Sequence, residues 1–157
     1  MKEIKYVEKE LTIQEIRNSL KSFENNPCDE TFVKTSFDLL LSDVYIPVKA
    51  QLLLLTNKDG FLKDEYFENN VIFNDIFYFI DNKNRWLPIA LDKEECKDCF
   101  PDESALIKIK YSQLCNEEVL NFGHIKGFII DITGTNLWLQ TEYIVEMSRL
   151  MKFMEGK

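Results

Sequence analysis

The sequence predicts an α+β fold in which helices cover a mixed or mostly antiparallel sheet. Two helix patterns open the chain, a hairpin pattern lies near its centre, and an amphipathic helix pattern closes it. Between them, strand and helix patterns do not alternate strictly, which disfavours a doubly wound parallel sheet. We expect a single domain over residues 1–157, since that length supports one core and no linker-like segment interrupts it.

The first two predicted elements are helices. Thr12 and Glu15 have the spacing of a capping box. The apolar residues after Thr12 recur every three or four positions, which predicts a helix over residues 13–24, and the Asn-Asn-Pro stretch ends it. Asp29 is then placed to cap a second helix over residues 30–42, whose wide apolar face suits packing on a sheet.

Three apolar runs follow that are typical of strands. Residues 44–48 form a short strand pattern at a sheet edge or strand end, because Pro47 has no N–H for the ladder. The run Leu52–Leu55 is strand-like by its length and its flanks, and a turn follows at residues 57–60. The strongest strand pattern is Val71–Ile80, which is apolar on both faces, as a central strand requires.

A hairpin and a short helix are predicted next. Residues 61–70 mix polar and aromatic side chains and are expected to form a loop. The turn at residues 81–84 should return the chain into a partner strand over residues 85–91. Asp92 is placed to cap a short helix over residues 93–100.

The last third of the chain alternates between strand and helix patterns. Residues 107–111 alternate apolar and charged side chains, which predicts a half-exposed strand. Ser112 is placed to cap a helix that runs to about Phe122, and Gly123 has the usual position of a C-terminal glycine.

A second hairpin and a helix end the chain. Residues 127–132 predict a buried strand, and the Thr-Gly-Thr turn after it leads into a hairpin partner over residues 136–139. Apolar residues then recur at helical spacing from Tyr143 to Met154, which predicts an amphipathic helix docked by one face.

Composition restricts the classes of partner. The formal net charge is −8, and only three of the 19 basic residues are Arg. A negative protein repels phosphate, so we expect neither nucleic acid nor an anionic membrane as a partner. The sequence lacks Gly-rich phosphate loops, which leaves no indication of a nucleotide or another cofactor. With no signal-peptide pattern and no long apolar run, the expected location is the cytoplasm.

Several short segments together resemble a known family. They are Leu39–Val48 (LLLSDVYIPV), Arg85–Cys96 (RWLPIALDKEEC), Ile107–Leu114 (IKIKYSQL) and His124–Leu139 (HIKGFIIDITGTNLWL). Their order and apolar patterns resemble the SseB N-terminal-type domain, named for enhanced serine sensitivity, over roughly residues 13–152. The Phe-Thr pair that follows a strand in that family is missing after Pro88, and the turn at Asp131–Gly134 also departs from its pattern. The resemblance implies an α+β domain, often a small stand-alone bacterial protein, that acts as a binding or adaptor module. It transfers no functional residue to this chain.

The cysteines offer one candidate chemistry. Cys96 and Cys99 form a C-x2-C pair, which could be half of a zinc site completed by Cys115 and His124, or a redox pair. The spacing is not that of a standard zinc finger, and the acidic neighbours do not favour a reactive thiolate. The simpler interpretation is that both cysteines lie on a short helix as free thiols, at least one packed inward. Since His124 follows Gly123 at a helix end, it is expected to bond the last carbonyls.

Charge and tryptophan suggest a second candidate site. An acidic run could dock a basic protein or could simply be a solvated helix face; its members are Asp92, Glu94, Glu95, Asp98, Asp102 and Glu103. Trp86 and Trp138 each lie in a predicted strand and would mark an interface if both were exposed on one face.

The leading hypothesis is therefore a non-enzymatic cytoplasmic module that binds another protein, for example an immunity- or antitoxin-like module that neutralises a basic partner. The alternative is a zinc- or small-molecule-responsive module that uses the Cys96 and Cys99 pair. An enzyme is not expected, because the single histidine has no Ser or Cys signature near it.

Overall fold

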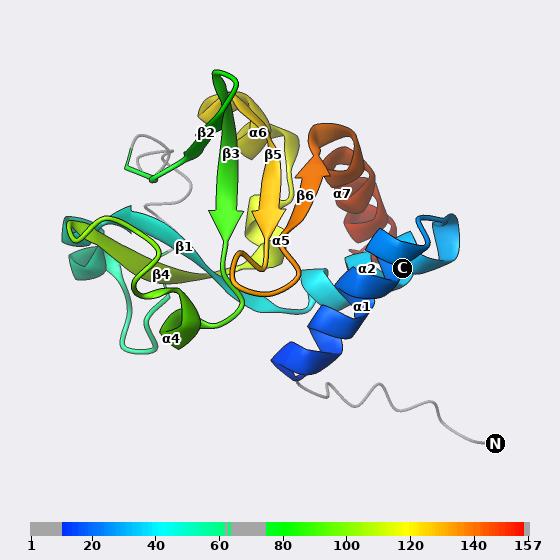
Figure 1. The fold of residues 1–157 in the computed structure, drawn as a ribbon, viewed down its shortest axis with the longest axis horizontal. Helices are drawn as coiled ribbons and strands as arrows, with labels where there is room; N and C mark the ends of the chain where they lie inside the picture. Colours follow the sequence, from blue (N-terminus) through cyan, green and yellow to red (C-terminus); the bar gives the residue numbers. More distant parts are fainter. Residues whose placement is uncertain (1–10, 62, 64–74, 156–157) are drawn as a thin grey trace.

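A computed structural model describes residues 11–61, 63 and 75–155 (Figure 1). Its elements are α1 (Ile13–Asn25), α2 (Asp29–Leu40), β1 (Asp43–Lys49), the 3₁₀ helix η1 (Ala50–Leu55), β2 (Phe79–Asp81), β3 (Asn84–Ile89), α4 (Lys93–Cys96), β4 (Ser104–Lys110), α5 (Tyr111–Leu114), α6 (Glu117–Gly123), β5 (Ile125–Ile130), β6 (Leu137–Gln140) and α7 (Thr141–Glu155). The predicted α+β class is confirmed, with two N-terminal helices and a C-terminal helix around the strands. In the described part of the chain, no helix is both long enough and apolar enough to cross a membrane.

The strands form two sheets. One contains only β1 and β4, paired antiparallel, and the other has the order β2-β3-β5-β6. In the four-stranded sheet, β2–β3 and β5–β6 are antiparallel and β3–β5 is parallel, so the sheet is mixed. Asn82 and Lys83 connect β2 to β3 with positive φ angles of 49° and 70°, as a two-residue hairpin turn requires. The predicted central hairpin is thereby confirmed. Tyr45 and Ala90 exchange two backbone hydrogen bonds of 2.9 Å, which join the two sheets.

One face of the four-stranded sheet forms much of the core. Its side chains come from alternate positions of β3, β5 and β6 and are all buried: Leu87, Ile89, Phe128, Ile130, Leu137 and Leu139. The helices α6 and α7 contact β5 from this side, and Figure 1 shows α5 and α6 behind the sheet. Tyr111 on α5 packs edge-on against Phe128 with ring centroids 5.9 Å apart, which ties this side of the sheet to α5. This face is therefore the covered one.

The N-terminal helices begin largely as their sequence predicts. The Thr12 hydroxyl accepts a hydrogen bond of 3.1 Å from the Glu15 N–H, which confirms the predicted cap of α1. The predicted cap of α2 at Asp29 is wrong by one residue: Cys28 is the N-cap, and the Thr31 hydroxyl accepts from its N–H at 3.1 Å. Asp29 lies in the first turn instead, where its negative charge still favours the helix through the dipole.

Two strand predictions are wrong. The run Leu52–Leu55 lies in the 3₁₀ helix η1 instead and therefore does not extend a sheet. Of its four leucines, only Leu52 is buried. Of Val71–Ile80, residues 71–74 lie outside the described residues. Only Phe79 and Ile80 enter a regular strand, and β2 is an exposed edge rather than a central strand. The predicted loop at 61–70 also falls almost wholly outside the described residues.

Two helix predictions also need correction. The helix expected from Ser112 to Phe122 breaks at Cys115, because the Asn116 side chain accepts a hydrogen bond of 2.9 Å from the Val119 N–H and so starts a new helix, α6. The helix expected over residues 93–100 is the single turn α4, capped as predicted by Asp92, which accepts from the Glu94 N–H at 2.9 Å.

Candidate functional site

The second face of the four-stranded sheet carries an aromatic cluster. Strand register places Phe79 beside Trp86, Trp86 beside Gly127, and Ile129 beside Trp138 on this face. In Figure 1 it is the face turned toward the viewer, where no helix crosses β3 or β5. We call it the open sheet face: the side chains of Phe79, Trp86, Ile129 and Trp138, together with the cavity beside them.

Trp138 is exposed but firmly held. Its ring centroid lies 4.8 Å from that of Trp86 and 5.5 Å from that of Phe79, both edge-on. The indole N–H donates a hydrogen bond of 2.8 Å to the side-chain oxygen of Asn136. Trp138 is still 40% exposed and Phe79 49% exposed, whereas Trp86 is buried. The structure thus brings both tryptophans to one face, but the condition stated from the sequence, that both be exposed, is not met, because only Trp138 is open to a partner.

Gly127 makes room for this arrangement. A Cβ atom at position 127 would lie 2.7 Å from Cζ3 of Trp86 and 2.1 Å from the backbone oxygen of Leu139. The Trp86 ring therefore rests on the bare backbone of β5, and from there it supports Trp138.

A cavity of about 350 Å³ lies beside Trp138. Its lining is mostly apolar and comes from β2 and the segment before it, β3, β5, β6, the segment after α4 and the loop after β5: Phe77, Tyr78, Phe79, Pro88, Cys99, Phe100, Pro101, Ile129, Ile132, Asn136 and Trp138. Burial raises the pKa of Tyr78 to about 12, opposed in part by the Arg85 guanidinium, which lies 5.3 Å from the ring centroid. A cavity of this size and lining suits an apolar side chain or a small apolar ligand.

The predicted acidic run is divided by the structure. Asp98 and Asp102 are exposed and flank the cavity-lining segment 99–101. Glu94 lies 3.8 Å from Lys97, and Asp92 is used as a cap. Glu95 forms an ion pair with Arg17. Only part of the run is therefore available to a partner, and that part adjoins the open sheet face.

The structure does not bring the predicted zinc ligands together. Cys96 is buried and its thiol lies 3.8 Å from the Thr133 hydroxyl, whereas the buried Cys115 thiol donates to the Ile144 carbonyl at 3.4 Å. Cys99 is exposed and lines the cavity. Within the described ranges, no group of three or more His, Cys, Asp or Glu side chains is placed to hold a metal ion.

His124 has a structural position at the end of α6. Its φ angle is 50°, so it supplies the left-handed residue that the sequence assigned to Gly123. Its backbone N–H donates to the carbonyl of Asn121 at 3.3 Å. The helix-end location is as predicted, and the backbone, rather than the imidazole, makes this bond.

The four thiols should differ sharply in reactivity. Hydrogen bonds from Thr31 lower the pKa of the exposed Cys28, whereas burial raises the pKa of Cys96 and raises that of Cys115 to about 12. Because the thiolate is the nucleophile, we expect iodoacetamide at neutral pH to label Cys28 first and the exposed Cys99 next. In the native protein Cys96 and Cys115 should react far more slowly, and at a comparable rate only after denaturation. Peptide mass spectrometry against time checks this, and labelling of native Cys115 at the rate of Cys28 would contradict it.

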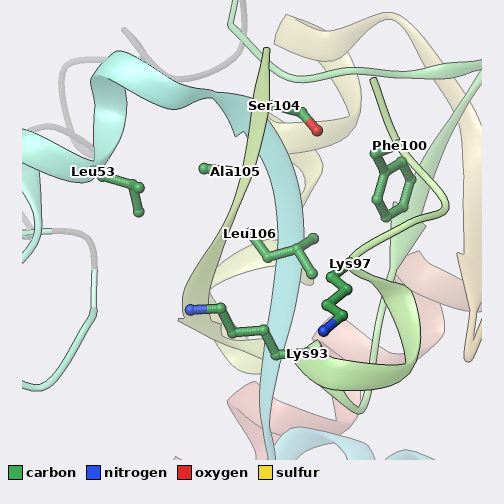
Figure 2. A pocket seen from close by; sticks show the side chains of 7 residues that line it. All are labelled: Leu53, Lys93, Lys97, Phe100, Ser104, Ala105 and Leu106. Carbon is green, nitrogen blue, oxygen red and sulfur yellow. The ribbon is translucent and has the colours of Figure 1, made fainter. Parts of the chain in front are cut away.

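Two other cavities are weaker candidates. One of about 200 Å³ lies between α4, β4 and Leu53, and Figure 2 shows Lys93 and Lys97 reaching from α4 across the space beside Leu106. Both lysines are solvent-exposed, so water screens their attraction for an anion. Another, of about 400 Å³, lies beside Phe23, Phe32 and Tyr143, but two carboxylates and the polar start of α2 also line it. The first has no fixed, exposed aromatic side chain, and in the second, where Phe23 and Phe32 hold the exposed Tyr143, the carboxylates interrupt the apolar lining.

Sequence reasoning named the tryptophans but missed Phe79 and Asn136. A signal for the orientation of Trp138 was present: in Leu-Trp-Leu-Gln over residues 137–140, the tryptophan alternates with two leucines and so lies on the opposite face. The role of Asn136 depends on its φ angle of 53°, a conformation that asparagine tolerates, and sequence alone did not indicate it.

No family model, curated protein or solved structure was found to match this chain. The resemblance to SseB N-terminal-type domains therefore stays a prediction.

Proposed function

We propose that this chain is a non-enzymatic module that binds another protein through the open sheet face. The observation that carries the proposal is Trp138, which is exposed while Trp86, Phe79 and Asn136 hold its ring in place. An aromatic ring that is fixed before binding loses little conformational freedom on binding. Tryptophan is also among the residues that most often dominate the energy of an interface.

The cavity beside Trp138 supports one kind of contact. Its walls are formed by side chains such as Phe77, Pro88, Phe100 and Ile129. An apolar side chain of the partner would enter this space and leave water, which is favourable by roughly 1.5–3 kcal/mol for a large aliphatic or aromatic group. The partner is thus expected to present an apolar anchor.

The charge of the chain supports a basic partner. The net charge is −8, and the exposed Asp98 and Asp102 stand on either side of the lining segment 99–101. Complementary charge speeds association and disfavours acidic competitors. An immunity- or antitoxin-like module that neutralises a basic protein in the cytoplasm is a concrete form of this proposal, and the adaptor role implied by the SseB-like resemblance agrees with it.

Replacing Trp138 with alanine should weaken partner capture strongly. We expect at least a tenfold loss of affinity, about 1.4 kcal/mol, with the fold retained. A pull-down from native lysate with the wild type and Trp138→Ala, read by mass spectrometry, measures the loss. Leu54→Ala is the matched control, because Leu54 is 85% exposed on η1 and lines none of the cavities described above.

The outcomes separate the possible occupants. A stoichiometric basic protein retained by the wild type and by Leu54→Ala, but not by Trp138→Ala, supports the proposal. The same proteins recovered with all three variants would contradict it. Light scattering of the purified chain gives another contrary outcome: a dimer that Trp138→Ala dissociates would show that a second copy covers the open sheet face.

A further inference from the structure

Arg17 on α1 connects three segments that are distant in sequence. Its Nε lies 3.0 Å from Oδ2 of Asp131 and its Nη2 lies 3.1 Å from Oδ1, so these two nitrogens bind the carboxylate in a bidentate manner. Its Nη1 donates to Oε1 of Glu95 at 3.3 Å, and Nη2 also contacts Oε2 of Glu95. Asp131 follows β5 and Glu95 lies on α4, so one guanidinium joins α1, α4 and the β5–β6 loop.

Glu95 adds a second connection between α4 and that loop. The Thr133 hydroxyl donates to Oε2 of Glu95 at 2.9 Å, and the thiol of the adjacent Cys96 lies 3.8 Å from the same hydroxyl. The hydrogen bonds from Arg17 and Thr133 lower the pKa of Glu95, so the carboxylate stays ionised at neutral pH. Glu95 therefore links α1 to the β5–β6 loop from a position on α4.

Two segments connected through Glu95 line the cavity of the open sheet face: the chain that leaves α4, the helix that carries Glu95, and the β5–β6 loop, whose Thr133 binds it. The chain leaving α4 contributes Cys99, Phe100 and Pro101, and the β5–β6 loop contributes Ile132 and Asn136. The helix α4 has only four residues, too few to be stable without tertiary contacts. Its placement must therefore come from what its side chains bind.

We infer that Glu95 is a positioning residue that fixes one wall of the cavity, formed by residues 99–101 and the β5–β6 loop. Its part in partner binding rests on the proposed function, whereas its effect on the wall does not. Glu95 can fix the wall although its ion pair with Arg17 is partly exposed, because it contacts both α1 and the β5–β6 loop. Arg17 is in turn bound to the buried Asp131. Through Arg17, Glu95 thus connects the short surface helix α4 to the buried Asp131.

The test compares Glu95→Gln with Glu94→Gln. Both remove one negative charge from α4, but the Glu94 side chain is 79% exposed and lies 3.8 Å from Lys97, outside the Arg17 network. Thiol labelling reports the result without any partner. In Glu95→Gln the wall should open more often, so native Cys96 should be labelled about fivefold faster. Cys115, buried beside α7, should stay protected, and Glu94→Gln should match the wild type.

Two labelling results would overturn the inference. One is a Cys96 labelling rate in Glu95→Gln equal to that of the wild type, since the wall would then be held without Glu95. The other is a parallel rise at Cys96 and Cys115, since the change would then weaken the whole fold rather than one wall.

Nile red, an uncharged dye that brightens in apolar surroundings, tests the cavity itself. Its affinity should fall in Glu95→Gln and stay unchanged in Glu94→Gln. Faster Cys96 labelling with unchanged dye affinity would refute the link between Glu95 and the cavity. The Trp138→Ala pull-down tests the proposed function separately, so the failure of either idea can be told from the failure of the other.

Discussion

Alanine at position 127 should destabilise the fold by about 3 kcal/mol. The added methyl carbon would lie 2.1 Å from the Leu139 carbonyl oxygen, 2.7 Å from the Trp86 ring and 3.0 Å from Cα of Gln140. Two of these atoms belong to the backbone of β6, so no side-chain rotation relieves the clash. Relief requires β5 and β6 to separate, which breaks the edge of the four-stranded sheet. Urea unfolding of Gly127→Ala, followed by circular dichroism, gives the free energy of unfolding.

Gly60→Ala is the matched control for that experiment. Gly60 lies in the turn after η1 with a φ angle of 86°, and a Cβ atom there would meet no heavy atom within 4 Å. Its substitution adds the same methyl group at the cost of backbone strain alone, about 1–2 kcal/mol. A smaller loss of stability in Gly127→Ala than in Gly60→Ala would refute the argument from the close packing of β5 on Trp86 and β6.

Elements with a regular period and a local cap were predictable from the sequence. The helix α1 combines a Thr12 cap with apolar residues at helical spacing, and α7 has the same spacing from Tyr143 onward. Such patterns work because the periodicity of the side chains reflects the geometry of the helix itself. The hairpin of β5 and β6 was predictable for a similar reason, since a turn signal separates two short apolar segments.

The wrong predictions concern apolar runs with no clear period. The run Leu52–Leu55 suits a strand by composition, but a strand must also pair with another strand. In this structure the run forms a 3₁₀ helix instead. Val71–Ile80 was expected at the centre of a sheet, whereas its last residues form the edge strand β2. The parallel pairing of β3 with β5 was likewise not predictable, because it brings together segments separated by the strand β4 and the three helices α4, α5 and α6.

The candidate site was predictable only in part. Alternation in β6 places Trp138 away from the core, but whether another element covers that face depends on the whole topology. The network behind the cavity wall gave no local signal at all, because Arg17 and Asp131 are 114 positions apart. Asp131 has a φ angle of 60°, a conformation that aspartate tolerates but that its presence in the sequence does not predict.

Replacing Arg17 with methionine should cost about 3 kcal/mol of stability. The Asp131 side chain is only 1% exposed, and Arg17 supplies both of the contacts that balance its charge. Methionine keeps much of the volume of the arginine stem but leaves a buried carboxylate with the Thr135 N–H, at 2.8 Å, as its remaining described donor. An uncompensated buried charge is far more costly than a missing surface ion pair. Urea unfolding of Arg17→Met at neutral pH measures the loss.

The double variant Arg17→Met with Asp131→Asn should recover part of that loss. Asparagine is neutral, tolerates the φ angle of 60° and keeps an oxygen that can accept from the Thr135 N–H. If the cost in Arg17→Met comes from the buried charge, the two changes are strongly coupled, and the double variant should be more stable than Arg17→Met by about 1–2 kcal/mol. If the cost comes only from lost packing of the arginine stem, Asp131→Asn will add its own penalty and the double variant will be the less stable of the two. The sign of that difference therefore decides whether charge compensation or packing is the reason that α1 stays attached to the β5–β6 loop.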